Sequence, residues 1–131
     1  MTAETIFHEI PGGPAFVDWF GCVPRFHDAT LLAINLASRT ESTLVIHTWR
    51  ITDVVDDAGF VVLDRHVVVT IAMEAIRCVS LNYFNKLPAI IFDLGLARVR
   101  DRFELTWNSS YGVEGTLQAK QMRIGFVPGK P

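Results

Sequence analysis

The segment that ends at Ala29 places an imidazole, His27, beside a carboxylate, Asp28, just before the first strand-like stretch of the chain. A histidine titrates near neutral pH, so His27 could act as a general base if a carboxylate held its ring. Adjacent residues of an extended chain point in opposite directions, which disfavours Asp28 for that task. We therefore favour a structural interpretation, in which Asp28 caps a turn and His27 bonds to a backbone carbonyl group.

The other residues that commonly carry chemistry show none of the spacings that catalytic or metal sites use. Patterns for a serine nucleophile, a nucleotide-binding P-loop and a dinucleotide-binding glycine loop are absent. No histidine stands two or four residues from another, and neither cysteine has a partner at metal-binding spacing. We expect no enzyme activity, no cofactor and no metal, with His47 a half-buried strand residue and His66 a solvated one. The residues concerned are His8, His27, His47, His66, Cys22 and Cys78.

Three carboxylates gather in one short segment, at Asp53, Asp56 and Asp57, just before the turn residue Gly59. Their spacing lacks the alternation of a calcium-binding loop, so we expect a solvated acidic loop. Such a loop can present charge to a basic partner, since complementary potentials speed encounter and reject wrong partners. Exposed aromatic side chains supply much of the contact in many interfaces. The candidates for contact with a partner or ligand are therefore Trp19, Phe26, His27, Asp28, Asp53, Asp56, Asp57 and Tyr111.

The composition describes one folded domain. The chain has 131 residues, which suits a single domain over residues 1–131, since one core organises about 100–150 residues. Half of the residues are hydrophobic and the net charge is −2, so the basic footprint of a dedicated nucleic-acid binder is missing. Residues 1–64 hold three basic and nine acidic residues, whereas residues 65–131 hold nine and five. Any acidic surface is therefore expected from the first half.

The sequence predicts neither an export signal nor a segment that spans a membrane. The N-terminal stretch has acidic residues where a signal peptide needs basic ones, and it lacks an apolar core segment. No run of 18 apolar residues occurs in the chain. We expect a cytoplasmic protein that does not associate with membranes.

The apolar pattern predicts one short helix followed by strands. Pro14 suits a first helical turn and Gly21 a helix end, so a helix is expected over Pro14–Phe20. From Thr30 onward the apolar residues recur with period two, as in strands with one buried face. The expected strands are 31–36, 44–49, 67–74, 77–81, 90–96, 103–107 and 117–126, with turns at 38–42, 56–59, 82–88 and 109–112.

Two features of these strands can be checked in detail. The alternation places Ile90, Phe92, Leu94 and Leu96 on one face, and a break in phase near residues 120–121 indicates a bulge. About seven strands with short polar turns and no crossover helices predict an antiparallel β-sandwich or a partly closed barrel with one short N-terminal helix. An α+β sheet covered by the N-terminal segment remains the alternative.

Several short motifs resemble the immunity protein 50 family, bacterial cytoplasmic proteins assigned as antitoxins of polymorphic toxin systems. The similarity spans nearly the whole chain. The motifs are Trp19 followed by Phe26-His27-Asp28-Ala29, the turn Asp57-Ala58-Gly59-Phe60, the loop Leu81-Asn82-Tyr83-Phe84-Asn85 and Ser110-Tyr111-Gly112. The resemblance implies a non-enzymatic protein that binds and blocks a cognate toxin, and it implies no catalytic residue.

Two functional hypotheses therefore stand. In the first, the chain neutralises a toxin through exposed aromatic residues and the acidic loop 53–57. In the second, Trp19, Phe26, His27 and Asp28 surround an apolar cavity under the short helix, which binds or transforms a small molecule. A homodimer formed through sheet edges is a lesser third interpretation.

Overall fold

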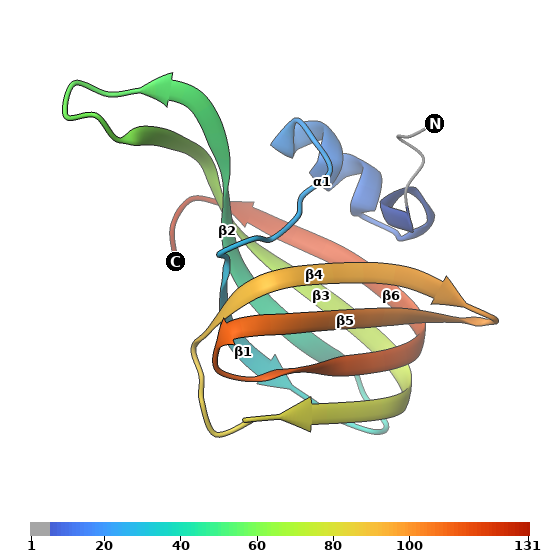
Figure 1. Ribbon diagram of the computed structural model, residues 1–131. Coiled ribbons are helices and arrows are strands. Elements are labelled where there is room, and N and C mark those ends of the chain that lie inside the picture. The colour runs from blue at the N-terminus through green and yellow to red at the C-terminus, as the bar shows by residue number, and fades with distance from the viewer. Residues whose placement is uncertain (1–5) are drawn as a thin grey trace.

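The computed structural model describes residues 6–131, so the first part of the stretch used to judge a signal peptide, residues 1–5, lies outside the described residues. Figure 1 shows a curled sheet with a helical segment at one end. The elements are η1 (Ile6–Glu9), α1 (Gly13–Phe20), β1 (Thr30–Asn35), β2 (Ser42–Val55), β3 (Val61–Asn82), β4 (Ala89–Val99), β5 (Arg102–Tyr111) and β6 (Glu114–Pro128).

The six strands form one antiparallel sheet in the order β1-β2-β3-β6-β5-β4, which curls until its edge strands meet. The seam between β1 and β4 has two residue pairs, Thr30 with Ile90 and Leu31 with Ala89. The predicted mainly β fold is confirmed, and the architecture is the partly closed barrel. There are fewer strands than expected, because β3 runs without interruption through the segments that the sequence divides in two.

Alternating apolar residues fill the barrel. Leu44 and Ile46 on β2 and Val69 and Ile71 on β3 are fully buried. Leu105 on β5 and Leu117 on β6 are fully buried in the same core. Burial of each such side chain contributes roughly 1.5–3 kcal/mol to stability. This inward set matches the period-two pattern of β2, β3 and β5, which explains why the fold class could be predicted.

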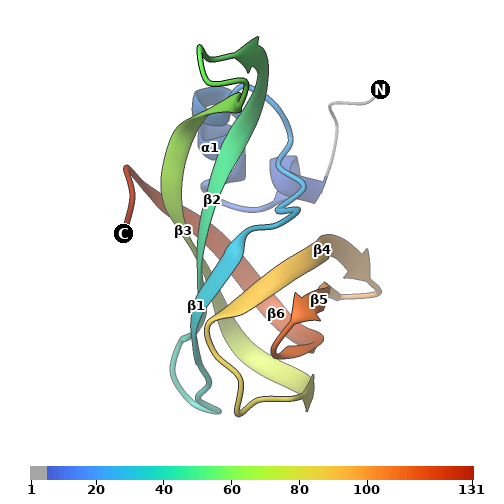
Figure 2. The same ribbon diagram turned by 60° about the vertical axis from the view of Figure 1, so that its left-hand side comes forward.

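The predicted short helix is confirmed, and it closes one end of the barrel (Figures 1 and 2). Phe16 is fully buried, with its ring centroid 5.2 Å from that of Phe126 on β6. Gly12 precedes the helix at φ 85°, and a Cβ atom there would lie 1.9 Å from the Ile124 carbonyl oxygen. The helix ends at Gly21, φ 94°, whose N–H donates to the Val17 carbonyl. The close approach of the backbone at Gly12 to Ile124 of β6, rather than helix propensity, therefore holds the helix at this end of the barrel.

Irregular pairing overturns the predicted face of β4. Ile90 and Phe92 are exposed, whereas Ala89 and Ile91 are fully buried. The register of β4 against β5 shifts twice, on either side of Ile91. After Ile91 the pairing advances two residues on β4 against one on β5, and this extra residue exchanges the inward and outward faces of β4. The single face predicted for Ile90, Phe92, Leu94 and Leu96 is therefore wrong.

The break in phase at residues 120–121 of β6 is present, but it is not a bulge. The facing residues Glu74 and Ala75 of β3 break phase at the same point, and Ala75 has φ 57°. The pairs on either side, Glu74 with Gln121 and Ile76 with Ala119, keep one register. Both strands therefore bend together. The turn expected at 109–112 is also shorter, because β5 continues through Tyr111.

Candidate functional site

The hairpin of β2 and β3 extends beyond the barrel as a two-stranded ribbon, which we call the arm (residues 50–64). β1 pairs with β2 only as far as His47, and β6 pairs with β3 only as far as Val67. Beyond these points the described strands pair only with each other. Figures 1 and 2 both show the arm projecting past the helical end of the barrel.

The arm carries large apolar side chains that nothing in the described chain covers. Phe60 at its tip is 70% exposed, the highest value among the exposed large apolar residues. Ile51 pairs with Leu63 and Val55 pairs with Val61, so exposed apolar residues face each other across the ribbon. Apolar patches on a soluble protein commonly mark sites of contact with another molecule. The exposed set is Ile51, Val54, Val55, Phe60, Val61 and Leu63.

The acidic loop predicted from the sequence lies at the tip of this arm. Asp56 organises the turn, because its Oδ1 accepts hydrogen bonds from the N–H groups of Ala58 and Phe60, each at 2.9 Å. Asp53 and Asp57 are exposed, and residues 51–63 include three aspartates and no basic residue. The tip therefore combines negative charge with apolar surface.

Charged groups on one face of the arm's root join its two strands to each other and to α1. Arg50 donates two hydrogen bonds to Asp64, at 2.9 and 2.8 Å, and these bonds hold the pKa of Asp64 below its ordinary value. Arg65 adopts φ 53° where the β2–β3 register shifts, and its guanidinium carbon lies 5.4 Å from the centre of the Trp19 ring. Trp19 also stacks on Phe126 of β6 at 5.5 Å. The predicted ligand contact Trp19 is thus a support for the arm.

The other side of the root carries a cluster of rings that the sequence did not predict. Nε2 of His47 and Nδ1 of His66 lie 3.1 Å apart, and the Trp49 ring is 5.1 Å from the first and 5.9 Å from the second. His47 is half-buried, as expected. His66 was expected to be solvated, which is wrong, because its ring packs into this cluster and its carbonyl accepts a hydrogen bond from Gly129.

Burial lowers the pKa of both histidines. For His47 the next cause is the neighbouring charge of His66, and for His66 it is the charge of Lys130. Asp64 acts in the opposite direction on His66. Both rings are accordingly favoured in the neutral form.

His27 and Asp28 lie at the barrel seam, away from the arm's tip. His27 donates from Nδ1 to the Phe92 carbonyl oxygen at 2.7 Å, which confirms the predicted bond to a backbone carbonyl. Asp28 has φ 65° and its Oδ2 lies 3.7 Å from His27 Nε2, so the expectation that it points away is wrong. Within residues 6–131 its carboxylate caps no backbone N–H, contrary to expectation. Phe26 is 3% exposed and belongs to the core, not to a surface.

Tyr111 marks a second exposed patch, on the outer side of the seam. It pairs with Ile90 across β4 and β5, and both side chains are exposed. Lys86 Nζ lies 5.7 Å from the centre of the Tyr111 ring, and the His27 ring lies edge-on to Phe92 at 5.2 Å. Sequence reasoning missed Ile90 and Phe92 here because the register shifts of β4 turn them outward.

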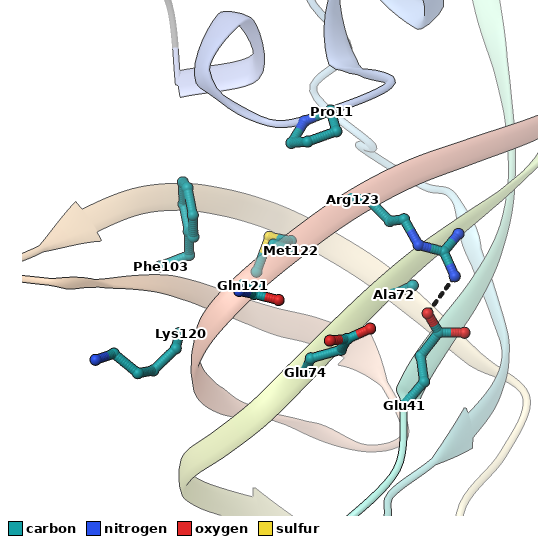
Figure 3. Close-up of a pocket in the computed structure, with 9 residues that line it drawn as sticks. All are labelled: Pro11, Glu41, Ala72, Glu74, Phe103, Lys120, Gln121, Met122 and Arg123. Carbon is teal, nitrogen blue, oxygen red and sulfur yellow. Dashed lines mark hydrogen bonds and ion pairs between the residues drawn. The ribbon is translucent and has the colours of Figure 1, made fainter.

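A hollow with charged residues on its wall lies at the bend of β3 and β6 and has a volume of about 330 Å³ (Figure 3). Its floor includes the buried residues Ala72 and Met122. Arg123, on its wall, is paired with Glu41, and Lys120 is paired with Asp101 at 3.3 Å, which lowers the pKa of that aspartate. Most of its charge is therefore balanced within the chain.

Five of the best-formed hollows over residues 6–131 lie elsewhere than beside His27, where a cavity was expected. His27 and Asp28 line none of the five, and neither does Trp19. This geometry gives no support to a general base with an enclosed substrate at His27. In the same residues no three His, Cys, Asp or Glu side chains gather to hold a metal ion. No helix in that range has the length and apolar character needed to cross a membrane.

The described structure thus distributes the predicted site residues over three places. Asp53, Asp56 and Asp57 lie on the arm, Trp19 lies at its root, and His27, Asp28 and Tyr111 lie along the seam, whereas the eighth predicted residue, Phe26, is buried in the core. Comparisons of the chain with protein-family models, with curated proteins and with solved structures give no match.

Proposed function

We propose that the protein is a non-enzymatic binding protein of the immunity type, which neutralises a cognate bacterial toxin in the cytoplasm by docking the arm onto it. The observation that carries the proposal is the arm itself, an uncovered apolar ribbon with an acidic tip. The motifs that resemble the immunity protein 50 family support the same role. No step of catalysis is needed, because a bound arm excludes the toxin's substrate.

The arm has the properties of an efficient anchor. Aromatic residues at the centre of an interface often contribute 2 kcal/mol or more, and Phe60, the most exposed of the large apolar residues, stands at the tip of the arm. The Arg50–Asp64 pair joins the two strands of the arm, and the Arg65–Trp19 contact orients its root against α1 before binding. A pre-formed anchor loses little conformational entropy on association, which favours affinity.

The chemistry of the arm defines the partner's surface. Residues 51–63 bear three carboxylates and no cation, so the complementary site has an apolar floor and a basic rim. Such a pairing accelerates association at low salt and weakens as salt screens the charges. A cleft of this character is expected on the toxin.

The test is co-expression with the product of a neighbouring toxin gene, followed by isolation of the complex. Wild-type chain is expected to rescue growth, and Phe60→Ala to weaken binding by roughly 30-fold, the equivalent of 2 kcal/mol. The double variant Asp53→Asn, Asp57→Asn is expected to slow association and to remove much of its salt dependence. Asp93→Asn, which neutralises an exposed carboxylate on β4, is the matched control.

Two results would overturn the proposal. One is the absence of any complex with the toxin. The other is a complex whose affinity is the same for the Phe60 variant, the double variant and the Asp93 control, since the toxin would then bind elsewhere. Gel filtration of the free chain tests whether a second copy occupies the arm.

A further inference from the structure

The ring cluster at the arm's root lies where support from the rest of the sheet ends. On the side nearest the arm, the pairing of β2 with β1 ends at His47, and the pairing of β3 with β6 ends at Val67. His66 immediately precedes Val67. Just beyond them the β2–β3 register shifts, and Arg65 has a positive φ. The arm's direction therefore depends on side-chain contacts at this point rather than on neighbouring strands.

The contact between the two histidines requires one proton between the rings. A nitrogen-to-nitrogen hydrogen bond over 3.1 Å needs one N–H donor and one lone-pair acceptor. A first additional proton can enter at an outer ring nitrogen and leave the bond intact. A second one places an N–H on both facing nitrogens, which removes the acceptor and brings two cations together.

We propose that the His47–His66 pair is a proton-sensitive latch, which fixes the arm while the rings share one proton and releases it when both rings are charged. The two charged groups near the rings, Lys130 and Asp64, act on the pair in opposite directions. Lys130, in the C-terminal tail, opposes a positive charge on either ring. Asp64 favours it on His66, but its carboxylate is already bonded twice to Arg50.

Trp49 makes the state of the latch visible. Its ring lies within 6 Å of both imidazole rings, so their protonation changes the environment of its indole group. Resting on the proposed function, the latch adds regulation to it, because release of the arm at acidic pH removes the pre-formed anchor and weakens toxin binding. Its physical basis, however, is a property of the free chain.

The first experiment follows the free chain by NMR as the pH is lowered from 7.5 to 5. The imidazole signals of His47 and His66 are expected to titrate as a coupled pair below about 6.5, the ordinary histidine value, with the Trp49 indole signal moving alongside. Hydrogen exchange at the root amides, 48–52 and 62–66, is expected to accelerate beyond the intrinsic effect of pH, because local opening of the root becomes easier.

Glutamine keeps a donor and an acceptor but does not titrate, so His47→Gln and His66→Gln test the latch directly. Either variant is expected to abolish the acid-dependent acceleration, whereas His27→Gln, at the seam, leaves it unchanged. Independent titration of the two rings, or the same acceleration in both latch variants, would refute the proposal. These readouts do not involve a toxin, so a failure of the proposed function leaves the latch intact, and failure of the latch leaves the proposed function intact.

Discussion

Replacement of Phe60 by alanine separates the two roles that a large apolar side chain can have, stabilising the fold or binding a partner. A fully buried phenylalanine contributes up to about 3 kcal/mol through removal of its surface from water. Phe60 is 70% exposed, so about a third of that effect, near 1 kcal/mol, is the most that its removal should cost the folded chain.

Phe16→Ala is the matched comparison. Its ring is fully buried between Phe20 and Phe126, at 5.3 and 5.2 Å, so truncation leaves a cavity as well as losing buried area. Substitutions of this kind cost roughly 3–5 kcal/mol. The two variants remove the same atoms, and the expected difference between them, at least 2 kcal/mol, comes only from where the ring lies.

Urea unfolding followed by tryptophan fluorescence measures both free energies. We expect a small shift of the midpoint for Phe60→Ala and a large one for Phe16→Ala, while only the former weakens the toxin complex at concentrations where the chain is folded. A loss of more than 2 kcal/mol in Phe60→Ala would refute the reasoning, because the arm would then pack on the barrel rather than stand free.

Three further outcomes are expected. Folding lowers the pKa of His47 and His66, so the unfolded chain binds more protons than the folded one just below pH 6.5. The free energy of unfolding should therefore fall as the pH drops from that value. Urea titrations at pH 7.5 and 5 should show that this free energy depends less on pH in His47→Gln than in the wild type. Gly12→Ala should lower stability by more than about 2 kcal/mol, because its Cβ meets the Ile124 carbonyl and its φ is 85°; a thermal midpoint like that of the wild type would contradict this. Asp56→Asn should keep amide exchange at the arm's tip slow while Asp56→Ala accelerates it, since only asparagine keeps the oxygen that accepts two backbone N–H groups; equal exchange in both would show that the turn does not depend on this side chain.

Where a strand pairs regularly, its sequence pattern was sufficient to predict its buried face. Leu44 and Ile46 alternate with Val45 and His47, and the structure buries the first pair and leaves the second half-buried. Where a strand is irregular, the pattern misled. Ile90 and Phe92 look like residues of the same face as Leu94 because the extra residue that β4 gains after Ile91 leaves no mark in the apolar alternation.

The candidate site shows the same division. Asp56, Asp57 and Gly59 predicted a turn with exposed acids, because the chemistry that forms it acts within five residues of chain. The pairing of His47 with His66 and the support of Arg65 on Trp19 join residues 19 and 46 positions apart, and such contacts depend on register and twist.

By itself, the sequence determined the short helix, the antiparallel β class and the acidic turn, since all three follow from local backbone preferences and period-two burial. Only the tertiary structure decided that β2 and β3 outrun their neighbours and form an arm. The lengths of β1 and β6 limit how far the sheet supports them, and a residue is exposed or buried according to whether another strand or helix lies beside it. The apolar residues of the arm resemble a core strand in sequence, and they become a candidate binding surface because no part of the described chain covers them.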